Sequence, residues 1–290
     1  PNSAITIGSN AALTIDNSTT AALNRLSETA ALTMNGGSFN LIGSSTTSTS
    51  ESTGALTLAS GHNTITITPG SGGPTTMTFA SLSRTTGATV LFRGTSLGSS
   101  PGPNVSTLMF TSAPAVLGGG GGAGTTTASV IKGAFGDNSL SGTGSDMVVH
   151  NLGNTNGLRL LNGAGFSGEY SFTLATNANV KLNGDVVAST VNINSLILDG
   201  FSITNPGSAQ TITLSSGSLA GNILMNSATS IAGANTTLGI TTNHLDILTT
   251  ASATISAVIG TAVAGSVAIS GTGSATVSAA NFYTGTTFIN

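Results

Sequence analysis

Residues 54–58 read Gly54-Ala55-Leu56-Thr57-Leu58, and residues 11–15 and 30–34 are earlier versions of the same phrase. In each version two apolar residues flank one threonine, an alternation typical of a short strand with one buried face. The leucines at positions 13, 32 and 56 are separated by 19 and 24 residues. A period of roughly twenty residues matches one coil of a β-solenoid, in which each coil buries its apolar side chains against its neighbours.

Similar triplets recur along the whole chain, separated by turns rich in Gly, Ser and Asn. A helical pattern occurs only weakly, at residues 20–28. We therefore predict an all-β protein, a right-handed parallel β-helix forming a single elongated domain with one irregular protruding segment. A β-sandwich is the alternative, since it also has many short strands. Evenly spaced Asn-Gly hairpin turns would favour a sandwich, but Asn35-Gly36, Asn162-Gly163 and Asn183-Gly184 do not have that spacing.

The amino-acid composition limits the classes of binding partner that we expect. Of 290 residues, 38% are hydrophobic but only 5% are charged and 4% aromatic, so hydroxyls and amides must keep the surface hydrated. With only 6 Lys and Arg residues against 9 Asp and Glu, and a net charge of −3, the chain has too few cations to attract phosphates, so we do not expect nucleic acid as a partner. No apolar run approaches the roughly 18 residues of a bilayer-spanning helix, so we expect no membrane insertion of this segment. Cysteine is absent, which leaves the compartment open.

Three regions differ in regularity. Residues 1–93 and 171–290 carry the triplet pattern of β-helix coils, whereas residues 94–170 are irregular. That middle region holds the glycine run at 118–122 and a large share of the ionisable residues. We interpret it as a Gly-rich elaborated coil or loop within the same solenoid.

The candidate site lies in the middle region. Its functional interpretation is a small polar site for a sugar or an ion; the alternative is a loop whose charges hold one another in place. The three histidines are too scattered to indicate zinc, and we expect no metal, no cofactor and no catalytic residue. The candidate residues are Asp137, Asp146, His150, Arg159 and Glu169.

The final stretch, residues 269–290, resembles the autotransporter-associated β-strand repeat of bacterial surface proteins. The matching positions are Asn281, Tyr283, Thr284, Gly285, Thr286, Thr287, Ile289 and Asn290. Phe282 stands where the repeat usually has threonine, and one of its two glycines is missing. The rest of the chain resembles the repeat family only in its general sequence character and does not match the repeat motif. The resemblance implies a right-handed β-helix that is exported and placed at the cell surface.

These observations together favour a structural or adhesive segment of a long bacterial cell-surface or extracellular β-helix protein, and not an enzyme. No signal peptide opens the chain, so we expect an internal segment of a longer protein. Its partners would be flanking coils of the same long chain, or copies of itself stacked end to end into a filament or sheath. Surface glycans are a further possible partner, since a glycan-binding module is the first alternative. A polysaccharide-degrading β-helix enzyme is the second, and it requires Asp137, Asp146 and Glu169 to converge in one groove.

Overall fold

All regular secondary structure in the computed structural model is β-strand, within the residues that the structure describes: 3–150, 155–214, 220–240, 244–260 and 265–290. Most strands stack in parallel on the strand one coil away, so the predicted parallel β-helix class is confirmed. The helical pattern at residues 20–28 is misleading, because the chain forms only bends and turns there. Across the described ranges there is likewise no apolar helix long enough to span a membrane.

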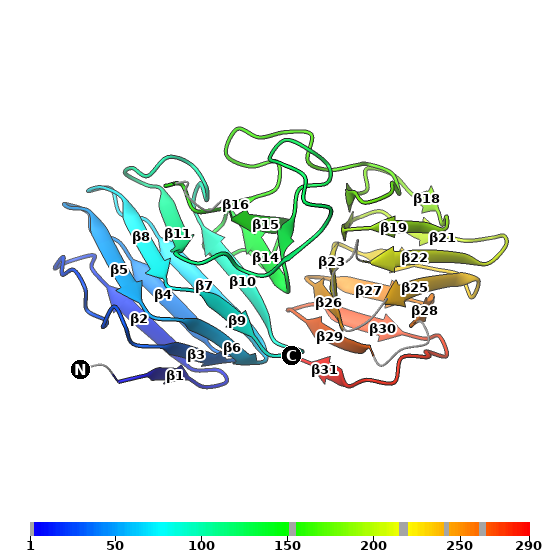
Figure 1. The fold of residues 1–290 in the computed structure, drawn as a ribbon, viewed down its shortest axis with the longest axis horizontal. Helices are drawn as coiled ribbons and strands as arrows, with labels where there is room; N and C mark the ends of the chain where they lie inside the picture. The colour runs from blue at the N-terminus through cyan, green and yellow to red at the C-terminus, as the bar shows by residue number, and fades with distance from the viewer. Residues whose placement is uncertain (1–2, 151–154, 215–219, 241–243, 261–264) are drawn as a thin grey trace. The chain divides into compact units, whose positions relative to one another are not determined.

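The chain divides into two compact units. The first consists of Pro1–Ala115 and Ala134–Gly165, and the second of Val116–Gly133 and Phe166–Asn290. The region predicted to be irregular, 94–170, is therefore shared between the two units, and its predicted boundaries are not the boundaries of either unit. Figure 1 shows the strands of the first unit in blue to green and most strands of the second in yellow-green to red.

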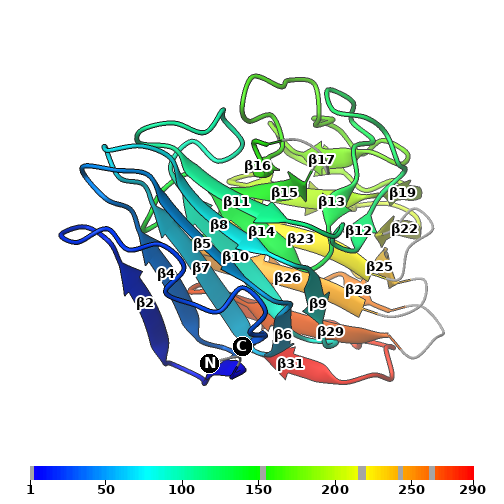
Figure 2. The same cartoon turned by 60° about the vertical axis from the view of Figure 1, so that its left-hand side comes forward.

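The coils of the first unit contribute strands to three sheets, which we name sheets A, B and C. Figure 2 shows β4, β7 and β10 of sheet B lying side by side. Sheet A contains β1 (Ile5–Ile7), β3 (Leu32–Asn35), β6 (Leu56–Ser60) and β9 (Leu82–Arg84). Sheet B contains β2 (Ala12–Asp16), β4 (Ser38–Ile42), β7 (His62–Thr68), β10 (Thr89–Gly94), β14 (Ala134–Asp137), β15 (Asp146–His150) and β16 (Leu158–Leu160). Sheet C contains β5 (Thr49–Thr53), β8 (Thr75–Phe79) and β11 (Ser106–Phe110).

The strand register explains why the repeated phrase is only partly periodic. Leu32 stacks on Leu56 in sheet A, so the interval of 24 residues is a true coil. The interval of 19 residues is not a coil, because Leu13 lies in sheet B and stacks on Phe39. The same local alternation suits any strand with one buried face, so one phrase recurs on two different sheets.

The parallel stacking of sheet B ends in antiparallel strands. β14 still pairs in parallel with β10, but β15 pairs antiparallel with β14, and β16 antiparallel with β15. Val148 and Leu160 pack directly over Gly136, where a Cβ atom would collide with both side chains. The antiparallel strands β15 and β16 therefore cover the edge of β14, the last parallel strand of this sheet, and open strand edges need such protection.

The second unit repeats the three-sheet plan, in sheets that we name D, E and F. The unit also contains a short antiparallel pair, β12 (Val116–Leu117) with β13 (Val130–Ile131). Sheet D contains β17 (Asn179–Lys181), β20 (Ser195–Asp199), β23 (Ala220–Asn226), β26 (His244–Thr249), β29 (Ser266–Ser270) and β31 (Thr287–Ile289). Sheet E contains β18 (Val186–Val187), β21 (Ile203–Thr204), β24 (Thr229–Ile231), β27 (Ser252–Ile255) and β30 (Ser274–Val277). Sheet F contains β19 (Val191–Ile193), β22 (Gln210–Leu214), β25 (Thr236–Ile240) and β28 (Val258–Ile259).

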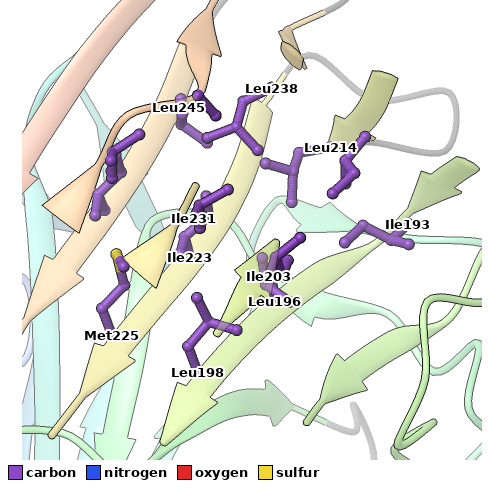
Figure 3. Close-up of a cluster of buried hydrophobic side chains, with 14 of the residues drawn as sticks. Ile193, Leu196, Leu198, Ile203, Leu214, Ile223, Met225, Ile231, Leu238 and Leu245 are labelled. Atoms are coloured by element: carbon purple, nitrogen blue, oxygen red, sulfur yellow. The ribbon is translucent and has the colours of Figure 1, made fainter. Parts of the chain in front are cut away.

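Apolar side chains from the three sheets meet inside the second unit (Figure 3). One column follows sheet D from coil to coil, because parallel register places like residues above one another. Fully burying each such side chain stabilises the fold by about 1.5–3 kcal/mol. The column consists of Val180, Leu196, Ile223, Ile247, Ile269 and Ile289.

Candidate functional site

The Asp137 carboxylate lies at the end of a polar column on the outer face of sheet B. Thr66, Arg93 and Asp137 occupy matching positions on β7, β10 and β14. Arg93 Nε donates to Thr66 Oγ1 at 3.0 Å. Burial lowers the pKa of Arg93, and the neighbouring Asp137 carboxylate acts in the opposite direction.

The loop after β14 closes over the Asp137 carboxylate. Its two oxygens accept the main-chain N–H groups of Ser139 at 2.8 Å and Gly144 at 3.0 Å. Gly142 packs directly against the carboxyl group, and its carbonyl accepts a hydrogen bond from Arg93 at 3.4 Å. Asp137 is 9% exposed. Its contacts are those of a carboxylate that fixes its own loop.

Asp146 and Arg159 lie on opposite faces of the sheet. Asp146 is opposite Gly136 across the β14–β15 pair, whereas Arg159 is opposite Val149 across the β15–β16 pair. Positions 146 and 149 are an odd number of residues apart, so their side chains point to different faces. By the same alternation Asp137 faces away from Asp146. Arg159 is buried, and its Nη1 donates to the Leu160 carbonyl at 3.0 Å.

His150 is held against the aromatic core of the first unit. The main-chain N–H of Phe110 donates to His150 Nε2 at 3.1 Å, which requires the proton to be on Nδ1 in the neutral ring. The imidazole also meets the Phe110 ring edge-on, with 5.5 Å between centroids. Burial lowers the pKa of His150, which favours the neutral form.

Glu169 belongs to the second unit, apart from the other four candidates. Its carboxylate is fully buried, and Oε1 accepts the main-chain N–H of Gly124 at 2.8 Å. Gly124 lies just after the glycine run at 118–122, so this loop directs a main-chain amide to a carboxylate of its own chain. Each candidate residue has a contact within its own unit, and sugar or ion binding by these residues stays a prediction.

The sequence interpretation missed a buried polar column on the outer face of sheet D. It contains one side chain from each of four consecutive coils, and all four are fully buried. Ser195 Oγ donates to Asn179 Oδ1 at 2.9 Å, and His244 Nε2 is hydrogen-bonded to Asp246 Oδ1 at 2.6 Å. The four residues are Asn179, Ser195, Asn222 and Asp246.

Segment 116–133 covers part of this column. Asn222 Nδ2 donates to the Ile131 carbonyl at 3.1 Å, and its Oδ1 accepts from Gly133 N–H at 3.1 Å. Asn179 Nδ2 donates to the Ala128 carbonyl at 2.8 Å. The two asparagines therefore bind the segment through its main chain, as a neighbouring strand would. The sequence signal was available: three consecutive apolar residues follow Ser195 and Asn222, a pattern typical of strands buried on both faces.

The geometry defines an all-β solenoid whose buried polar side chains bind loops of the same chain. No protein-family model, no curated protein and no solved structure matches this chain. The described residues contain no group of three or more His, Asp or Glu side chains that could hold a metal ion. Asp137 and Asp146 point to opposite faces of sheet B, an arrangement unlike the paired carboxylates of a glycosidase.

Proposed function

We propose that the chain is a structural or adhesive segment of a long bacterial cell-surface or extracellular β-helix protein. The observation that carries the proposal is the open coil at residues 266–290. In the apolar column of sheet D, Val180, Leu196, Ile223 and Ile247 are buried, whereas Ile289 is 74% exposed. β31 and β30 are the end strands of their sheets among the described strands.

The surface around this coil favours continued stacking. An open strand edge offers unpaired main-chain groups to any other strand, and many proteins protect such edges with charged side chains. Residues 247–290 contain no Asp, Glu, Lys or Arg. Phe282, 67% exposed, adds apolar surface to the open coil. An additional coil would bury these side chains without burying any charge.

The occupant that we propose for the open coil is another β-helical coil, supplied by the same long chain or by a second copy. The resemblance of residues 269–290 to a bacterial surface repeat supports this occupant and an extracellular location. A stack extended in this way provides length and stiffness through repetition, because each coil contacts only its neighbours.

Self-association of the isolated chain tests the proposal. We expect sedimentation velocity to show concentration-dependent assembly of the wild-type chain. The double variant Thr287→Lys, Ile289→Lys should stay monomeric, because it places charge at the open edge. Thr254→Lys is the matched control, since Thr254 is exposed on β27, inside sheet E, and it should assemble like wild type. A wild-type chain that stays monomeric at every concentration, or an edge variant that assembles normally, would contradict the proposal.

A further inference from the structure

The chain contains four Asn-Gly pairs, and in the structure three of them are held by hydrogen bonds or tight packing and one is not. In such a pair the glycine nitrogen can attack the asparagine side-chain carbonyl, because glycine has no Cβ to restrict the main chain. The reaction requires a main-chain N–H that is not held elsewhere and room for the backbone to rotate. The pairs are Asn35-Gly36, Asn156-Gly157, Asn162-Gly163 and Asn183-Gly184.

Three of the pairs are held by the fold. Gly36 N–H donates to Asn63 Oδ1 at 2.8 Å, and Gly163 N–H donates to the Leu160 carbonyl at 3.1 Å. Gly157 is buried, and a Cβ placed on it would collide with the Leu108 carbonyl. In each pair the attack must first break a hydrogen bond or tight packing.

The fourth pair, Asn183-Gly184, lies in the arc between β17 and β18 of the second unit. Asn183 is exposed, and a Cβ placed on Gly184 would meet no atom within 4 Å. Among the described residues, neither member of this pair forms a hydrogen bond. The nucleophile, the carbonyl and the space for rotation are therefore all available in the folded protein.

We propose that Asn183-Gly184 is a site of spontaneous deamidation in the folded chain. The Gly184 nitrogen forms a bond to Asn183 Cγ, the bond from Cγ to the amide nitrogen breaks, and ammonia leaves with the proton of the attacking nitrogen. Water then opens the five-membered succinimide at either carbonyl. The products are aspartate and isoaspartate, and the net reaction consumes one water and releases one ammonia.

The modification would alter the edge of sheet E. Isoaspartate at position 183 inserts one methylene into the main chain two residues before Asp185, whose Oδ1 accepts the Ser202 N–H at 2.8 Å. Val186 follows directly and pairs with Ile203. Either product also adds one negative charge, which changes the formal net charge from −3 to −4. We expect faster hydrogen exchange in β18 and β21 of the modified chain.

Peptide mapping by mass spectrometry tests the proposal. The purified full chain is aged in mildly alkaline buffer, both folded and in denaturant, and isoaspartate is quantified at all four pairs. In the folded chain the Asn183 peptide should deamidate at least about tenfold faster than the others, because they must first break a contact. In denaturant the four rates should converge. Comparable rates in the folded chain, or an unchanged ranking in denaturant, would overturn the proposal.

Matched variants test whether the isoaspartate signal arises from Asn183 and Gly184. Asn183→Gln should abolish isoaspartate at this position, and Gly184→Ala should slow its formation, since a Cβ restricts the main chain. Asn162→Gln is the control and should leave the Asn183 rate unchanged. If Gly184→Ala deamidates as fast as wild type in the folded chain, the proposed attack by the Gly184 nitrogen is wrong.

Discussion

Buried carboxylates of this protein bind main-chain amides of loops. Glu51, Asp137 and Glu169 are buried, and each accepts N–H groups from a loop of its own unit. Hydrogen bonds to a charged acceptor are about twice as strong as neutral ones. A chain with only 5% charged residues thus uses several of its carboxylates to hold irregular segments against the coils.

Glu51 gives the first prediction. Its Oε1 accepts Arg25 N–H at 3.1 Å and its Oε2 accepts Leu26 N–H at 3.2 Å, inside a fully buried site on β5. Glu51→Gln replaces one acceptor with an N–H₂ group that faces a donor. We expect the free energy of unfolding to fall by about 1–3 kcal/mol, measured by urea denaturation. Ser50→Ala, on the exposed side of the same strand, should change it by less than about 0.5 kcal/mol; equal effects would refute this role of Glu51.

His62 gives a pH-dependent prediction. Burial lowers the pKa of His62 from 6.5 to about 4, and the charge of Arg93 acts in the same direction. The His62 imidazole is therefore protonated below pH 6.5 in the unfolded chain, but in the folded chain only as the pH approaches 4. Stability is fully present above pH 6.5 and falls as the pH drops toward 4.

His62→Gln should remove this part of the pH dependence. Because His62 is partly exposed, we expect the wild type to lose only about 1–3 kcal/mol more than the variant over this interval. The measurement is the difference between the two unfolding free energies at a series of pH values, in which carboxylate contributions cancel. A difference that does not vary with pH would show that His62 titrates normally in the folded protein.

At the scale of elements, segment 116–133 depends on two asparagine side chains of sheet D. Asn222→Ala removes both hydrogen bonds to the segment and leaves the Ile131 carbonyl and the Gly133 N–H without these partners. We expect a loss of about 1–3 kcal/mol in stability and faster hydrogen exchange at Gly133. Asn192→Ala, at an exposed position of β19, is the control and should have little effect. Unchanged exchange at Gly133 in Asn222→Ala would mean that other contacts hold the segment.

The sequence predicted where strands form better than it predicted which strands pair with one another. Alternating triplets such as 5–7, 32–34 and 56–58 are strands in the structure, because period-two alternation reports directly which face is buried. The alternation carries no information on which sheet a strand joins, so Leu13 was placed one coil from Leu32 although it stacks on Phe39. Sheet assignment depends on the arc lengths between strands, which vary from coil to coil.

The sequence did not predict how the candidate site residues are arranged in space, and ligand binding by them stays a prediction. The proposed cluster assumed that ionisable residues close in sequence would meet in space. In the structure Asp137 and Asp146 point to opposite faces of sheet B, and Glu169 belongs to the other unit. The polar column of sheet D has the reverse property, since Asn179, Ser195, Asn222 and Asp246 are far apart in sequence and are brought together by coil stacking.

At the scale of the whole molecule, we propose that another β-helical coil stacks on the open coil at residues 266–290 and that the protein has an extracellular structural role. Immunogold electron microscopy of intact, unpermeabilised source cells tests this claim most directly, with an antibody raised against the folded chain. We predict gold particles on fibres or an ordered layer outside the cell envelope. Labelling that appears only after the cells are permeabilised would contradict the extracellular structural role.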